Sequence, residues 1–123
     1  MSSGRILLID DDDAFRKLVD VMLATAGYEV QMATSGNSGV ACYRQQRSDV
    51  VITDILMPDG EGLETIETLK ELDRDVKIIA MSTGGRGKFG YLDAAVAFGA
   101  RRILHKPFSR DQLLSTVADV LAG

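Results

Sequence analysis

The stretch ILLIDDDD at residues 6–13 is the most informative about the fold, because four apolar residues are followed at once by four carboxylates. A short and continuously apolar run is typical of a strand that other elements cover on both faces. After the acidic run, apolar residues recur at helical spacing as far as Gly27, which predicts a helix that ends there. This segment therefore predicts an interior strand that leads through an acidic turn into a helix.

The same alternation of apolar run and helical pattern occurs five times along the chain. The run VVI at 50–52 leads to Asp54, and further strands are expected at 76–81 and 103–104. Residues 29–33 alternate polar and apolar types, which is typical of an edge strand with one exposed side. Strands that alternate with helices favour a parallel sheet between two helical layers. The remaining helices are expected at 36–46, from Leu63 to Leu72, at 92–98, and from Ser109 with Gln112 as its capping-box partner.

Length and composition fit a single domain over residues 1–123. No apolar run approaches the roughly 18 to 20 residues of a membrane span, and the first residues do not have the pattern of a secretory signal. The only cysteine, Cys42, cannot form an internal disulfide. A cytoplasmic protein without a membrane partner is expected. The net charge of −4 argues against nucleic acid as a direct partner.

Two predicted interior strands end in carboxylates. If residues 29–33 form the edge, the first strand lies beside the third, and the ligand crevice of such a sheet lies at the carboxyl ends of these two strands. Asp10 and Asp11 follow the first strand, and Asp54 follows the third. Clustered carboxylates are a natural site for a hard cation with oxygen ligands such as Mg²⁺. A carboxylate beside that cation can act as a nucleophile toward phosphorus and form an aspartyl phosphate.

An acidic run after a strand also has a purely structural interpretation, as a helix N-cap with first-turn charges that face the helix dipole. We favour this interpretation for Asp12 and Asp13. For Asp10 and Asp11 taken alone both interpretations stay open, and Asp54 shifts the balance toward a site because it ends a strand and does not begin a helix. Ser82 and Lys106 follow the last two strands, so a hydroxyl and an ammonium are expected at the same edge.

With these groups in order, the chain resembles the receiver domains of two-component response regulators over essentially its whole length. The resemblance implies a flavodoxin-like (βα)5 three-layer sandwich with a five-stranded parallel sheet in the order 2-1-3-4-5. It also implies a phosphoryl group received on Asp54 from a sensor histidine kinase or a phosphotransfer protein. The matching motifs are ILLIDD at 6–11, DILMP at 54–58 with Gly62, AMS at 80–82 and KPF at 106–108.

The same resemblance assigns roles to single residues. It implies that Mg²⁺ is bound by Asp11, Asp54 and the backbone carbonyl of Leu56, while Asp10 acts largely through water. Ser82 and Lys106 resemble the switch hydroxyl and the phosphate-binding lysine, and the peptide bond after Lys106 is expected to be cis. No enzyme activity is implied beyond the domain's own phosphotransfer and autodephosphorylation, and the downstream target stays unknown.

Two features depart from the family pattern. Ile103 stands where the family usually has Tyr or Phe, so a switch based on a moving ring is not expected here. The loop 83–90 is unusually rich in glycine. Both features concern the output of the domain, because phosphotransfer chemistry depends on neither.

Three other functions deserve comparison. A phosphatase of the haloacid-dehalogenase type would use Asp10-x-Asp12, but Ala14 replaces the expected Thr or Val and a second acidic motif is missing late in the chain. A flavin or nucleotide binder would need a glycine-rich or hydroxyl-rich loop after the first strand, where this chain is anionic. A receiver-like domain that binds partners without phosphorylation is a closer alternative, although all the acceptor-site groups are present.

Overall fold

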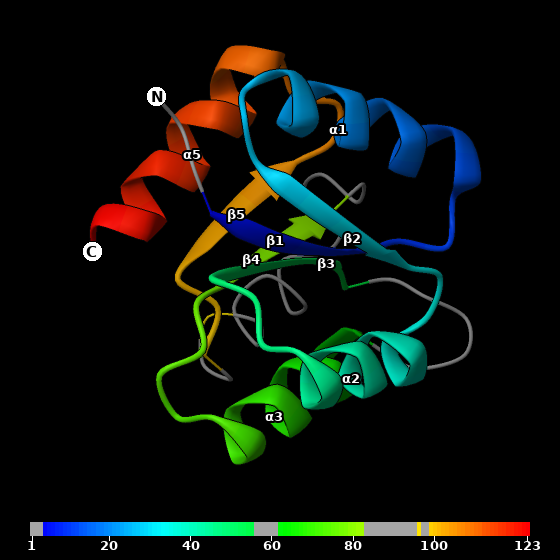
Figure 1. Ribbon diagram of the computed structural model, residues 1–123, viewed down its shortest axis with the longest axis vertical. Coiled ribbons are helices and arrows are strands. Elements are labelled where there is room, and N and C mark those ends of the chain that lie inside the picture. The colour runs from blue at the N-terminus through cyan, green and yellow to red at the C-terminus, as the bar shows by residue number, and fades with distance from the viewer. Residues whose placement is uncertain (1–3, 56–61, 83–95, 97–98) are drawn as a thin grey trace.

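The computed structural model describes residues 4–55, 62–82, 96 and 99–123. Five parallel strands form one sheet in the order β2-β1-β3-β4-β5, as Figure 1 shows. This confirms the predicted strand order and the flavodoxin-like class. The strands are β1 (Arg5–Ile9), β2 (Glu29–Ala33), β3 (Val50–Asp54), β4 (Ile78–Ser82) and β5 (Arg102–His105).

Helices cover both faces of the sheet and make three layers (Figure 1). In the part of the chain that the structure describes there are four: α1 (Asp13–Thr25), α2 (Gly36–Gln45), α3 (Gly62–Leu72) and α5 (Arg110–Ala122). The helix expected at 92–98 lies outside the described residues, except for Val96. Helices α1 and α5 lie on one face, while α2 and α3 lie on the other. None of the described helices is long and apolar enough to span a bilayer.

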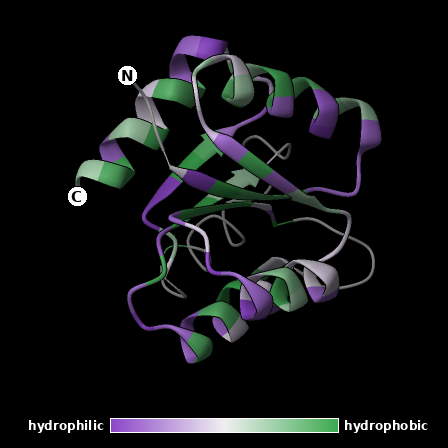
Figure 2. Ribbon diagram, viewed as in Figure 1, coloured by the Kyte–Doolittle hydropathy of each residue, from purple (hydrophilic) through white to green (hydrophobic). Residues whose placement is uncertain are grey.

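The two helical layers enclose two hydrophobic clusters, one on each face of the sheet. Successive strand residues point to opposite faces. Thus Leu7 belongs to the cluster under α2 and α3, and Leu8 belongs to the cluster under α1 and α5. Each helix carries both hydrophobic and hydrophilic residues, as Figure 2 shows. The continuously apolar runs are therefore buried because helices cover both sides of their strands.

The edge position of β2 is confirmed, but its exposure does not follow the simple alternation expected from the sequence. β2 pairs only with β1, in parallel register from Arg5 opposite Glu29 to Ile9 opposite Ala33. Met32 is 42% exposed, although its apolar type predicts a buried side chain. An edge strand has a neighbour on one side alone, so its side chains find fewer partners than those of a central strand.

Helix starts follow the capping residues of the sequence. Asp12 caps α1 by accepting a hydrogen bond from the backbone N–H of Phe15. Ser109 and Gln112 form the predicted capping box of α5. The structural interpretation of Asp12 is thereby confirmed. The end of α1 at Thr25, just before Gly27, also agrees with the sequence.

Tyr43 joins α2 to the turn that follows α3. Its buried side chain donates a hydrogen bond to Asp73 Oδ2 at 2.7 Å. This bond, followed by one from the backbone N–H of Asp75, lowers the pKa of Asp73. Burial and the same hydrogen bond raise the pKa of Tyr43 well above its ordinary value. The pair therefore stabilises the fold as an ionised carboxylate with a neutral phenol.

We expect Tyr43→Phe to lower the free energy of unfolding by about 1.5 kcal/mol at neutral pH, since a hydrogen bond to a charged group is lost. The contribution of Asp73 is present above its unfolded-state pKa of about 3.9 and disappears as the pH falls through the lower folded-state value. The difference between wild type and variant should therefore shrink below about pH 4. Urea unfolding at pH 7, 4 and 3 measures it, with Tyr28→Phe as the control for a buried tyrosine. A constant difference across this range would contradict the role of Asp73.

Candidate functional site

The carboxyl ends of β1 and β3 bring two aspartates together. The register pairs Ile9 with Thr53, so the residues that follow them, Asp10 and Asp54, lie side by side at one edge of the sheet. Asp10 also donates its backbone N–H to the carbonyl of Ala33 on β2, which fixes its peptide. The convergence expected from the strand order is thus present in the structure.

Asp11 completes an acidic cluster with these two residues. One carboxylate oxygen from each of Asp10, Asp11 and Asp54 lies within 4.8 Å of the other two. The Asp10 and Asp54 side chains are buried, with 0% and 6% exposure, whereas Asp11 is exposed. Two of the three carboxylates are therefore buried, and the third faces the solvent from which a cation would enter.

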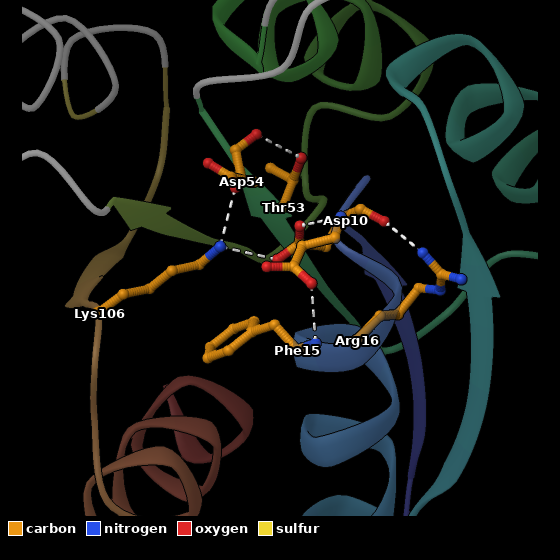
Figure 3. A network of polar contacts seen from close by, with 7 residues as sticks. Asp10, Phe15, Arg16, Thr53, Asp54 and Lys106 are labelled. Carbon is orange, nitrogen blue, oxygen red and sulfur yellow. Dashed lines mark hydrogen bonds and ion pairs between the residues drawn. The ribbon is translucent and has the colours of Figure 1, made fainter.

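Lys106 bridges the two buried acids. Its Nζ donates to Asp10 Oδ2 at 2.8 Å and to Asp54 Oδ2 at 2.9 Å, as Figure 3 shows. The lysine follows β5, and its backbone N–H donates to the carbonyl of Ser82 at 2.7 Å. Burial works to lower the pKa of Lys106, but the hydrogen bonds and charges of the two aspartates outweigh it and the pKa is raised. The ammonium therefore stays charged at neutral pH.

The start of α1 holds the acidic turn in place. Asp10 Oδ1 accepts the backbone N–H of Asp12 at 2.9 Å. Arg16 Nη1 donates to the carbonyl of Asp10 at 2.8 Å, as Figure 3 shows. Its Nη2 pairs with Asp13. The sequence predicted the structural roles of Asp12 and Asp13. It did not single out Arg16, whose spacing of three residues from Asp13 was the available signal.

The other predicted site residues have different outcomes. Ser82 is fully buried at the end of β4, one residue after Met81, which pairs with Asp54. The cis peptide between Lys106 and Pro107 is confirmed.

Leu56 lies outside the described residues, so the role of its carbonyl as a metal ligand stays a prediction. The part of the glycine-rich loop 83–90 in the output of the domain stays a prediction for the same reason. Ile103 is half-buried and packs against the hydrophobic cluster under α2 and α3.

Comparison with known proteins decides the family. The family model described as "Response regulator receiver domain" matches residues 6–118. The chain belongs to this family. Receiver domains are signalling modules, and the buried aspartates with the bridging lysine form the acidic pocket of this one.

Individual relatives agree with this assignment. The receiver domain is 31% identical to the chemotaxis protein CheY of Thermotoga maritima over 94% of this chain and 96% of that protein. It is 36% identical to the DNA-binding transcriptional regulator NtrC of Azospirillum brasilense, covering 98% of this chain but only a quarter of that protein's length. The solved structure of Vibrio cholerae CheY4 superposes with a TM-score of 0.89 at 30% identity, over 97% of this chain and 99% of the other.

Phe15 is a second residue whose place in the receiver site the sequence did not reveal. Its helical spacing predicted a core position, and the ring does pack against the cluster under α1 and α5. However, Lys106 Nζ lies over the same ring, 4.3 Å from its centroid. The available signal was an aromatic residue in the first turn of the helix that follows the acidic run.

Gly62, at the start of α3, packs directly against the backbone at the end of β3. A Cβ atom added there would overlap with the Cα of Ile55 and the carbonyl oxygen of Asp54. At Gly39 on α2, an added Cβ would instead overlap with the end of the Ile9 side chain. Backbone atoms cannot move aside as a side chain can, so the first glycine constrains the site more tightly.

Gly62→Ala should therefore lower the free energy of unfolding by about 3 kcal/mol or more, despite the gain of about 1 kcal/mol in helix propensity. Gly39→Ala has the same gain and a softer clash, so it should cost less, and Ile9→Val should relieve part of that cost. Chemical unfolding measures these free energies for the wild type, Gly62→Ala, Gly39→Ala and the double variant Gly39→Ala/Ile9→Val. Equal losses for the two glycine variants would contradict the difference between backbone and side-chain contact.

Proposed function

We propose that this receiver domain accepts a phosphoryl group on Asp54 from a sensor histidine kinase or a phosphotransfer protein, in a reaction that depends on Mg²⁺, and that phosphorylation switches partner binding. The observation that carries the proposal is the environment of Asp54. Its carboxylate lies in a cluster with two other acids and is hydrogen-bonded to the Lys106 ammonium at 2.9 Å. These are the groups that phosphoryl transfer needs for positioning and charge compensation.

The charge of the pocket fits a divalent cation. Three carboxylates and one ammonium leave a formal excess of two negative charges. An anionic phosphodonor would be repelled by this excess. Oxygen ligands with one exposed member suit Mg²⁺, which keeps several waters and binds substrate phosphate oxygens. Asp11, Asp54 and Asp10 would hold the cation, which would neutralise charge on the transferred group.

In the transfer step, an oxygen of the Asp54 carboxylate attacks phosphorus. A new O–P bond forms and the P–N bond to the donor histidine breaks, and the imidazole keeps the bonding electrons. The Lys106 ammonium, now shared by two carboxylates, can donate to a phosphoryl oxygen as charge builds up there. The Ser82 hydroxyl, at the end of the neighbouring strand, is proposed to contact another phosphoryl oxygen and so report phosphorylation.

The remaining functional assignments rest on the family. We infer no enzyme activity beyond the domain's own phosphotransfer and autodephosphorylation. Three relatives are described as DNA-binding transcriptional regulators, and the chain spans 25%, 48% and 25% of those proteins. The downstream target of this domain is therefore not assigned, and the absence of direct nucleic-acid binding stays a prediction from its net charge. A cytoplasmic location is likewise proposed.

Incubation with acetyl phosphate and Mg²⁺ should add one base-labile phosphoryl group, detected as an 80 Da increase in intact mass, a value set by the HPO₃ group itself. Asp54→Asn should abolish the increase because the nucleophilic oxygen is lost. The matched control is Asp12→Asn, which changes a neighbouring carboxylate to another good N-cap and should leave labelling unchanged. Labelling that persists in Asp54→Asn would refute the assignment of the acceptor.

Asp11→Ala should weaken Mg²⁺ binding by at least about tenfold, because even an indirect partner of a bound metal contributes that much. The fold should persist, since the side chain is exposed and its removal relieves repulsion with two other acids. Asp13→Ala, in the same acidic run but outside the cluster, is the control. A calorimetric titration with MgCl₂ measures both, and equal affinities would contradict the proposed ligand set.

A further inference from the structure

The proposed chemistry gives no role to Phe15, yet its ring lies against the charged group of the site. Lys106 Nζ is 4.3 Å from the ring centroid while it bonds to Asp10 and Asp54. Figure 3 shows the Phe15 ring beside the lysine chain, below the two acids. The ammonium is thus held by two carboxylates and by one aromatic face.

The position of this ring is fixed from two sides. The backbone N–H of Phe15 donates to the N-cap Asp12 at 3.1 Å, which places the residue in the first turn of α1. The ring meets Phe108 edge to face, with centroids 5.5 Å apart and an angle of 81° between the planes. Both rings pack against the cluster under α1 and α5. The face presented to Lys106 is therefore set by the core.

An ammonium over a ring face is attracted by the negative face of the quadrupole, and more strongly when it is shielded from water. The Lys106 side chain is only 9% exposed. It nevertheless forms part of the wall of an open hollow with Asp12, Phe15 and Pro107. Because the lysine side chain is flexible and borders this hollow, its ammonium can move toward solvent. The contact with the Phe15 ring opposes that movement.

We propose that Phe15 is a positioning residue for phosphoryl transfer: its ring face keeps the Lys106 ammonium at the acceptor carboxylate, ready to move onto a phosphoryl oxygen. The effect on phosphoryl transfer rests on the proposed function, whereas the contact between ring and ammonium is already present in the unphosphorylated protein. The simpler account is that Phe15 only fills the core. The two accounts differ in whether the electrons of the ring matter or only its shape.

The first test examines the contact without metal or phosphodonor. In wild type, the ε-methylene protons of Lys106 should show an upfield ring-current shift by NMR. Phe15→Leu should remove the shift and Phe15→Tyr should keep it. Tyr28→Leu is the matched control, because it removes a ring from the same cluster and leaves Phe108, which packs against Phe15, in place. A lysine with unshifted protons in wild type overturns the proposal, whether or not the domain accepts phosphate.

The second test changes the electrons of the ring at nearly constant shape. Phenylalanine at position 15 is replaced by its mono-, di- and trifluoro analogues, which weaken the negative face in steps. With acetyl phosphate and Mg²⁺, the initial rate of phosphorylation should fall with each fluorine, by about three- to tenfold in all. Thermal unfolding of each analogue checks that the core is intact. A rate that stays constant across the series overturns the proposal.

A double-mutant cycle then separates this proposal from the proposed function. If Phe15 acts through the lysine, Phe15→Leu should slow phosphorylation severalfold in the wild type and have little further effect in Lys106→Ala. Equal effects in the two backgrounds would show a structural role alone and overturn the proposal. If the wild type takes up no phosphoryl group, the proposed function fails, and the NMR test alone decides whether Phe15 positions Lys106.

Discussion

The bridge from the Lys106 ammonium to two buried carboxylates is the interaction on which the rest of this structure depends. A buried carboxylate without a partner is costly enough to change its protonation state or disrupt the fold. Here Asp10 and Asp54 lie at the ends of the neighbouring strands β1 and β3, and Lys106 follows the edge strand β5. The bridge thus joins residues 96 and 52 positions apart in the sequence, and it depends on the whole strand order being correct.

The parallel sheet makes this bridge possible. In parallel strands all carboxyl ends lie at one edge, so each strand delivers the next residue of the chain to the same place. β1, β3 and β4 are buried on both faces and cannot shift without exposing their apolar side chains. Register is therefore fixed by the core, and the core in turn fixes the spacing of the acidic pocket. The same rigidity explains the tight contact of Gly62 with the backbone at the end of β3.

The sequence was sufficient to predict the sheet order, the capped helices and the convergence of Asp10, Asp11 and Asp54, because these depend on local pattern and on strand topology. It did not reveal contacts that depend on how side chains of separate elements meet. Phe15 has the spacing of a core residue, and nothing in that spacing shows that one face of its ring meets the ammonium of Lys106, just after β5. The exposure of Met32 was missed for a related reason. Alternation predicts which face of the sheet a side chain points to, but not how many neighbouring side chains cover it.

Phe15 illustrates how a core can extend into a charged site. It packs edge to face with Phe108 and lies against the apolar cluster, while its own face meets Lys106. An aromatic ring is suited to both tasks because its surface is apolar enough to be buried and its face still attracts a cation. An aliphatic residue would fill the same volume but would offer the ammonium no compensating charge. The segment from Asp10 to Phe15 therefore supplies the pocket with acids on one side and with an electron-rich apolar surface on the other, and the lysine lies between them.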